Sequence, residues 1–170
     1  MSNAQYWLDN WAAFDNFKKQ HHKRLFLDNS ETIKEAVALA PKGHPIFDSL
    51  FEAGGAFVYP IAESPNAPPE MLAKLAEAEL AGASTYLLSD IVQNPSTPPE
   101  TLHKIASKMV LEQFSEWRCR KLAQNPNTAP HTLATLTLSQ DKETRQLAQE
   151  RLKNRHLYQH PLKAPTGEST

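Results

Sequence analysis

The chain is poor in cysteine and in glycine. It has one cysteine, Cys119, among 170 residues, so a disulfide framework within the chain is impossible. Five glycines are too few for the glycine turns that join the strands of hairpin-rich folds. Both shortages favour helices over disulfide-linked or hairpin-rich architectures.

Long hydrophobic runs and an excess of charge are also missing. No apolar stretch approaches the roughly 20 residues that span a bilayer, and no basic segment followed by an apolar one predicts a signal peptide. A single thiol fits a reducing compartment, so we expect a cytoplasmic protein with no membrane partner. The net charge of −1 gives no argument for nucleic acid, whereas 40% hydrophobic residues are enough for a core.

Proline is abundant by contrast, and the thirteen prolines mark an internal repeat. Three segments align without gaps around the anchor prolines Pro65, Pro95 and Pro126, which are spaced 30 and 31 residues apart. Each copy has an aliphatic pair, Asn or Ser before the anchor, a proline four residues after it, and leucine or isoleucine seven and ten residues after it. The clear copies are 61–76, 91–106 and 122–137, and degenerate copies start near residues 41 and 145.

The prolines predict where helices start and stop. Asparagine before proline is held out of the helical region, which ends the preceding helix. We expect Thr97 to cap the next helix, Pro98 to take its first position and Glu100 to complete a capping box. Thr128 is expected to act in the same way in the third copy, whereas Ala67 leaves the first copy without a cap. Each repeat is therefore predicted to be two helices joined by a proline turn.

These features predict an all-α fold, an α-solenoid of helical repeats with an N-terminal helical cap. Residues 1–40 form the cap, in which Ser30 or Thr32 opens the second helix. Residues 41–155 hold the repeats, and residues 156–170, which lack periodicity, are expected to form a mobile tail. Gly54 and Gly55 follow a predicted helix and are interpreted as a C-cap or hinge.

The succession of Asn-Pro, Thr-Pro and paired aliphatic residues, clearest at 91–106, resembles the variant leucine-rich repeat, a bacterial helical repeat family. The resemblance covers roughly residues 40–150 and implies a right-handed superhelix of alternating α and 3₁₀ helices that binds macromolecules, without shared catalytic residues. The repeat spacing here is longer than is usual in the family, which indicates that second helices are lengthened from 3₁₀ to α. Cys119 alone cannot hold the iron–sulfur cluster that one member carries.

Charge is unevenly distributed along the chain. Residues 25–116 carry five basic and thirteen acidic residues, whereas residues 117–163 carry nine basic and three acidic ones. In a linear array, position in the sequence is also position in space, so the basic part is a candidate binding surface. Its residues are Arg118, Arg120, Lys121, Arg145, Arg151, Lys153 and Arg155.

Two possible reactive sites each have a structural interpretation as well. Cys119 lies between two arginines, which lower a thiol pKa, but a cysteine packed in the core is far more common. His156 and His160 are four residues apart, as helical metal ligands are, yet they have no third ligand nearby and fit a polar helix end.

Two possible ligand-binding features are equally ambiguous. Trp7, Trp11 and Trp117 are either stacking platforms for bases or, as their helical spacing favours, core residues. The basic run from Lys18 to Arg24 is either a phosphate-binding patch or a solvated helix end.

The expected function is a non-enzymatic interaction module, a helical-repeat scaffold whose partner is another protein. No phosphate loop, zincin motif or nucleophile elbow appears, so we predict no catalytic, cofactor-binding or metal-binding residues. The alternative is a nucleic-acid-binding repeat protein that uses the basic C-terminal half. A third interpretation is an enzyme, such as a base-excision activity, with Trp117, Glu112 and Glu116 lining a groove.

Overall fold

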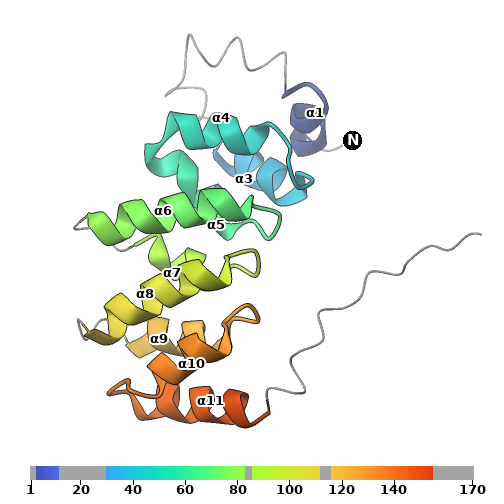
Figure 1. The fold of residues 1–170 in the computed structure, drawn as a ribbon. Helices are drawn as coiled ribbons and strands as arrows, with labels where there is room; N and C mark the ends of the chain where they lie inside the picture. Colours follow the sequence, from blue (N-terminus) through green and yellow to red (C-terminus); the bar gives the residue numbers. More distant parts are fainter. Residues whose placement is uncertain (1–2, 12–29, 83–85, 112–115, 155–170) are drawn as a thin grey trace, which may run out of the picture. The chain divides into compact units, whose positions relative to one another are not determined.

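The protein is described from a computed structural model, which covers residues 3–11, 30–82, 86–111 and 116–154 (Figure 1). These residues form helices and turns without a strand among them, which confirms the predicted all-α class. The chain divides into two compact units, residues 1–101 and 102–170, and the boundary lies within one helix. In the part of the chain that is described, no helix is long and apolar enough to cross a membrane. The expected mobile tail, 156–170, lies outside the described residues.

The first unit contains two rows of helices. One row consists of α1, α3, α5 and α7, each packed on the helix before it. The other row contains α4, which packs beside α5, and α6, which packs beside α7 (Figure 1). A 3₁₀ helix, η1, leads from α4 into α5. The bounds are α1 Asn3–Asp9, α3 Ser30–Leu39, α4 Ile46–Ala53, η1 Gly55–Val58, α5 Tyr59–Glu63, α6 Pro69–Ala81 and α7 Leu88–Ile91.

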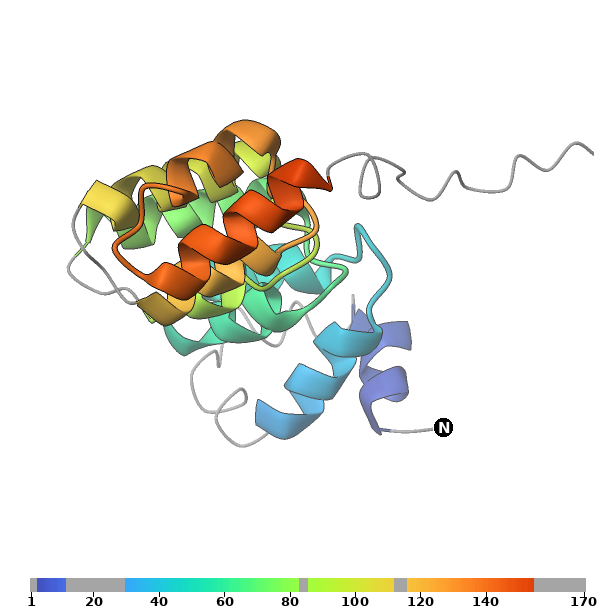
Figure 2. The ribbon, with the colours of Figure 1, turned by 90° about the horizontal axis from the view of Figure 1, so that it is seen from below.

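The second unit contains most of α8 (Pro99–Leu111) together with α9 (Glu116–Gln124), α10 (Pro130–Leu136) and α11 (Lys142–Lys153). Helix α11 packs on both α9 and α10, and the three lie side by side (Figures 1 and 2). Each clear copy therefore has two helices, α5 with α6, α7 with α8 and α9 with α10, as predicted. The helix between consecutive copies, which is expected to be lengthened from 3₁₀ to α, has nine residues in α9 but only four in α7.

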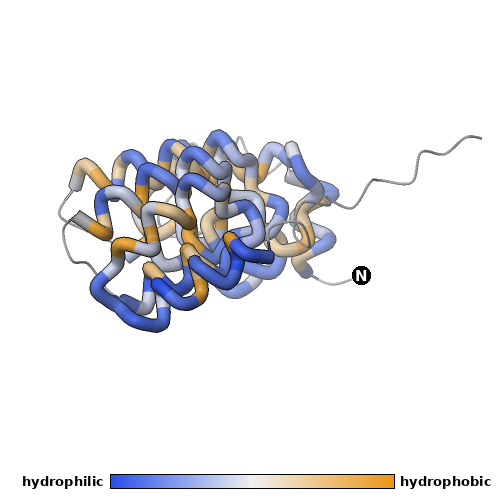
Figure 3. Tube along the Cα trace, turned by 60° about the horizontal axis from the view of Figure 1, so that its bottom comes forward, coloured by the Kyte–Doolittle hydropathy of each residue, from blue (hydrophilic) through white to orange (hydrophobic). Residues whose placement is uncertain are grey.

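The repeated aliphatic residues form the core. Hydrophobic and hydrophilic stretches are mixed along the tube of the helices (Figure 3), as in helices that bury one side. Burying one such leucine or isoleucine side chain contributes about 1.5–3 kcal/mol. The residues seven and ten positions after the anchor prolines are all buried, namely Leu72, Leu75, Leu102, Ile105, Leu133 and Leu136.

The residue before each anchor proline closes the turn with its own side chain. The Asn94 amide oxygen accepts a hydrogen bond from the backbone N–H of Ser96 at 2.8 Å, and Asn125 accepts one from Asn127 at 2.9 Å. In the first copy the Ser64 hydroxyl accepts the equivalent bond at 3.3 Å. The turn needs a short side chain whose oxygen accepts from the backbone N–H two residues later. Asn and Ser meet this need, which explains why they occupy the position.

The amide nitrogen of Asn94 also joins two copies of the first unit. It donates to the carbonyl oxygens of Ala62 and Ser64, each at 2.7 Å, and the Asn94 side chain is buried. The Ser64 hydroxyl makes a similar connection to the Val37 carbonyl at the end of α3. These carbonyls lie at helix ends, where no intrahelical partner is available, so the side chain of the following copy satisfies them.

The predicted threonine caps are wrong. The hydroxyl of Thr97 donates to the Ile91 carbonyl at 2.6 Å, and that of Thr128 donates to the Leu122 carbonyl at the same distance. Both threonines therefore complete the helix that precedes them, and α8 begins at Pro99 rather than at Pro98. The reason is the proline that lies four residues after each anchor proline, because the residue before it, Pro98 or Ala129, is held out of the helical region and separates the threonine from the helix start.

Two other helix boundaries match the sequence. Helix α3 begins at Ser30, one of the two predicted positions, and Thr32 lies inside it. Gly54 ends α4 with a φ of 64° and Gly55 follows with a φ of 58°, both in the left-handed region that glycine tolerates best. The interpretation of this pair as a C-cap is confirmed.

Replacing Asn94 by alanine tests the connection between copies. Asn94→Ala removes a buried donor from two carbonyls, so the free energy of unfolding is expected to fall by about 1–3 kcal/mol, measured by urea denaturation. Gln93→Ala, at the exposed neighbouring position, is the control and is expected to change it by less than about 0.5 kcal/mol. Equal effects of the two substitutions would contradict the role given to Asn94.

Candidate functional site

Six of the seven basic residues predicted to form a binding surface lie on two packed helices of the second unit. Helix α9 carries Arg118, Arg120 and Lys121, and α11 carries Arg145, Arg151 and Lys153. The seventh, Arg155, lies outside the described residues. Contacts of these side chains decide whether their charge is available to a ligand.

Arg120 lies among three carboxylates. Its guanidinium forms ion pairs with Asp141 at 3.3 Å, with Glu143, and with Glu116 one turn earlier on α9 at 3.8 Å. The two pairs to Asp141 and Glu143 join α9 to the start of α11. The positive charge of Arg120 is therefore compensated within the chain.

Asp141, which pairs with Arg120, is also the N-cap of α11. Its carboxylate accepts hydrogen bonds from the backbone N–H of Thr144 at 2.9 Å and from the Thr144 hydroxyl at 2.7 Å. These hydrogen bonds to Thr144, helped by the charge of Arg120, lower the pKa of Asp141. Asp141 is thus a structural N-cap with a stable negative charge.

Arg151 binds backbone carbonyls at the opposite end of α9. One guanidinium nitrogen donates to the carbonyl oxygens of Ala123 and Asn125, both at 2.7 Å. By alignment of the copies, these correspond to Ala62 and Ser64, the carbonyls that Asn94 binds in the first unit. Arg151 therefore takes the role that the asparagine amide has between earlier copies.

Arg145 and Lys121 are engaged as well. Arg145 donates to the carbonyls of Ser139 and Gln140, both at 2.7 Å, in the turn before its own helix. The ammonium of Lys121 lies 5.5 Å from the centroid of the Trp117 ring, a cation–π distance. Lys153 is exposed and Arg118 is half-buried. Arg120, Arg145 and Arg151 are thus each held by acceptors within the chain.

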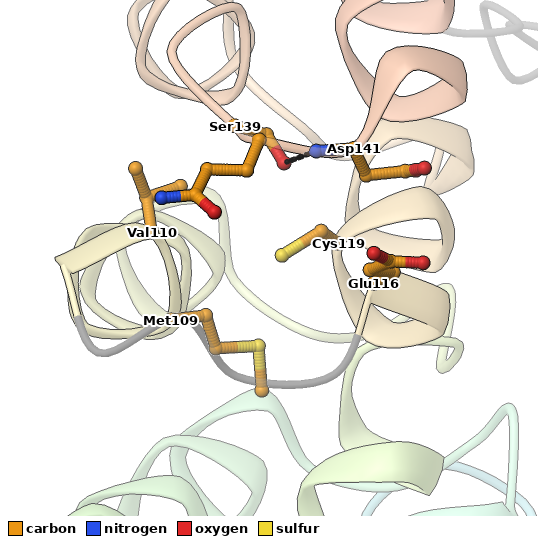
Figure 4. Close-up of a pocket in the computed structure, with 7 residues that line it drawn as sticks. Met109, Val110, Glu116, Cys119, Ser139 and Asp141 are labelled. Carbon is orange, nitrogen blue, oxygen red and sulfur yellow. Dashed lines mark hydrogen bonds between the residues drawn. The ribbon is translucent and has the colours of Figure 1, made fainter.

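A small cavity lies between α8, α9 and the turn before α11, all in the second unit. Its volume is about 220 Å³, and Met109, Cys119 and Asp141 are among the residues that line it (Figure 4). The thiol of Cys119 points into the space between α8 and α9. Burial is the main cause of its raised pKa, and the charges of Asp141 and Glu116 add to it.

The raised pKa decides between the two interpretations of Cys119. A nucleophilic cysteine needs a lowered pKa and access to solvent, whereas this thiol is buried and faces acidic neighbours. The expectation that the adjacent arginines lower its pKa is wrong, because burial of the thiol raises the pKa most and the charges of Asp141 and Glu116 act in the same direction. The interpretation as a core residue is the one that the structure supports.

The tryptophans differ from one another. Trp11 is buried and its indole N–H donates to the Ser49 hydroxyl at 3.2 Å, so the expectation of a core residue is confirmed there. Trp7 is half-buried, with its ring centroid 6.2 Å from that of Trp11. Trp117 is 44% exposed, which contradicts its assignment to the core. Glu112, the other residue of the hypothetical catalytic groove, lies outside the described residues.

The remaining sequence candidates lie outside the described residues, namely the basic run 18–24 and the pair His156 and His160. Within the ranges that the structure describes, no group of three or more histidine, cysteine or acidic side chains is placed to hold a metal ion. Sequence inspection overlooked one contact, between His103 and His131, because the two residues are far apart in sequence. Comparison of the aligned copies, in which both histidines are unusual, contained the signal that points to this pair.

Comparison with protein-family models, with curated proteins and with solved structures finds no match.

Removing the Asp141 cap tests its structural role. Asp141→Ala is expected to lower the free energy of unfolding by about 0.5–2 kcal/mol at neutral pH, whereas Asp141→Asn, which retains a capping side chain, is expected to cost less. Because the pKa of Asp141 is lowered on folding, its contribution is complete above the unfolded value of about 3.9 and is lost as the pH falls through the folded value. Denaturation curves of wild type and alanine variant should therefore converge in acid, and a constant difference would contradict the assignment.

The reactivity of Cys119 is tested by thiol labelling. In the folded protein at pH 8, a disulfide reagent is expected to label the thiol at least ~100-fold more slowly than in concentrated urea, because labelling requires the helices to open. Equal rates in the folded and unfolded states would restore the interpretation as a reactive cysteine.

Proposed function

We propose that this protein is a non-enzymatic, protein-binding scaffold, an α-solenoid of the variant leucine-rich repeat type with an N-terminal helical cap. The proposal rests on the alignment of the repeats and on their two-helix units. Asn94 occupies a position that holds asparagine or serine in every clear copy. Its side chain forms hydrogen bonds within the fold, so recognition of a partner is left to the surface residues that vary between copies. A cytoplasmic location is part of the same proposal, because it suits a chain with one buried thiol.

The observation that favours protein over nucleic acid is the state of the arginines. Arg120 is paired with carboxylates, and Arg145 and Arg151 bind backbone carbonyls. Binding to nucleic acid depends mainly on basic side chains that neutralise phosphates, and arginines held in this way would first have to break their internal bonds. The second unit also exposes the apolar side chains of Trp117 and Leu138, and tryptophan is enriched at protein interfaces.

The nucleic-acid alternative is retained because Lys153 is exposed and Lys121 lies beside the exposed Trp117 ring. A ring next to a cation is able to stack on an unpaired base while the cation contacts phosphate. This alternative predicts affinity that falls steeply with salt, whereas a protein partner does not require it.

The two functions are separated by binding assays on the full chain. Fluorescence anisotropy with labelled duplex DNA, single-stranded DNA and single-stranded RNA at about 50 mM salt is expected to show no specific binding. Affinity capture from a lysate treated with nuclease is expected to return a reproducible protein, and purified partner should bind Trp117→Ala at least ~10-fold more weakly. Gln149→Ala, at an exposed position on α11, is the matched control. Salt-sensitive binding to nucleic acid, together with capture that nuclease abolishes, would overturn the proposal.

A further inference from the structure

Two histidines from different copies of the repeat meet in the second unit. His103 lies on α8 and His131 lies on the first turn of α10. Their ring centroids are 4.5 Å apart and their planes cross at 73°. His131 is exposed and His103 is half-buried, so the pair lies at the surface.

Both histidines are departures from the repeat. In the aligned copies, the position of His103 is held by Ala73 and Ala134, and the position of His131 is held by Glu70 and Glu100. Core packing does not account for either change, because neither side chain is buried. The two exceptional residues are nevertheless in contact with each other, which points to a joint role for the two rings.

We propose that His103 and His131 bind a transition metal ion of the zinc or nickel class, with water at the other coordination positions. Imidazole nitrogen is a favoured ligand of both ions. A zinc–nitrogen distance of about 2.0–2.1 Å and a tetrahedral angle place the centroids of two ligating rings roughly 5 Å apart, close to the separation found here. Rotation of the exposed His131 ring about its terminal torsion brings a nitrogen towards the ion.

Thr132 positions His103 for this role. Its hydroxyl lies 3.3 Å from Nδ1 of His103, and the Thr132 side chain is buried. A ligating histidine commonly has its second ring nitrogen held by such a partner, which fixes the tautomer and the orientation of the ring. With Nδ1 held by the hydroxyl, Nε2 of His103 is the nitrogen that ligates the metal.

The ligand count determines the kind of site. Among the described residues, no third histidine, cysteine or carboxylate joins these two histidines. The remaining coordination positions are therefore open to water, and the ion exchanges readily. The sequence alone predicts no metal ligands, because His103 and His131 are far apart in the chain and lie in different copies of the repeat. His103 and His131 are brought together by the pairing of consecutive copies.

The test uses metal-free, untagged full-length protein titrated with zinc chloride and with nickel chloride by calorimetry. His103→Ala and His131→Gln are expected to bind at least ~10-fold more weakly than wild type, and Thr132→Val to show a weaker loss in the same direction. The other copies hold alanine at the first position and glutamate, which glutamine resembles in shape, at the second, so both variants are expected to fold, which circular dichroism and thermal unfolding without metal will verify.

The control is the double variant His156→Ala and His160→Ala, which removes the other pair with metal-ligand spacing and is expected to bind as wild type does. A saturating excess of metal should also raise the melting temperature of wild type and of this control, but not that of His103→Ala. The proposal is overturned if the His103 and His131 variants bind metal as tightly as wild type, or if binding is lost only in the His156 and His160 variant.

Discussion

The fold depends on the restriction that proline places on the residue before it. At Asn94 this restriction ends one helix, and at Pro98 it delays the start of the next until Pro99. The chain between these two points is a fixed turn, in which the Asn94 side chain reaches the carbonyls of the preceding copy. Hydrogen bonding between copies therefore follows from a local steric rule rather than from a long-range preference.

The same turns leave helix ends with unpaired backbone groups, and the side chains of the repeat are selected to satisfy them. Thr97 and Thr128 each bind a carbonyl six residues back, at equivalent positions of two copies. Ala67 stands at that position in the first copy and has no hydroxyl to offer. Threonine at this site thus completes the preceding helix, whether Pro98 and Pro99 follow it, as after Thr97, or Ala129 and Pro130, as after Thr128.

Sequence inspection predicted the helix pairs and the buried aliphatic positions, because both follow from spacing alone. Leu102 and Ile105 are three residues apart and share a buried face, as a helical period requires. It failed at Thr97, because the rule for a capping threonine was applied without the competing effect of consecutive prolines. The short length of α7 and the position of η1 were out of reach, because such short helices depend on packing against neighbours rather than on a periodic pattern.

The candidate surface shows a similar limit. Counting charges identified Arg120 and Arg145 as available cations, but their partners come from the start of α11 and the turn before it. Such partners are set by tertiary structure, and the count treats paired and unpaired charges alike. The thiol of Cys119 shows the same limit, because its burial, together with the nearby carboxylates, raises the pKa that its two arginine neighbours in the sequence are expected to lower.

Arg151 has a consequence for the growth of the array. It occupies the Ala123 and Asn125 carbonyls, which in an earlier copy receive the amide of the next asparagine. The degenerate copy that contains α11 is thus joined to the third copy by an arginine in place of the asparagine. Whole units inserted ahead of residue 122, by gene duplication or by design, therefore leave Arg151 together with the carbonyls of Ala123 and Asn125, whereas a unit inserted between α10 and α11 separates them.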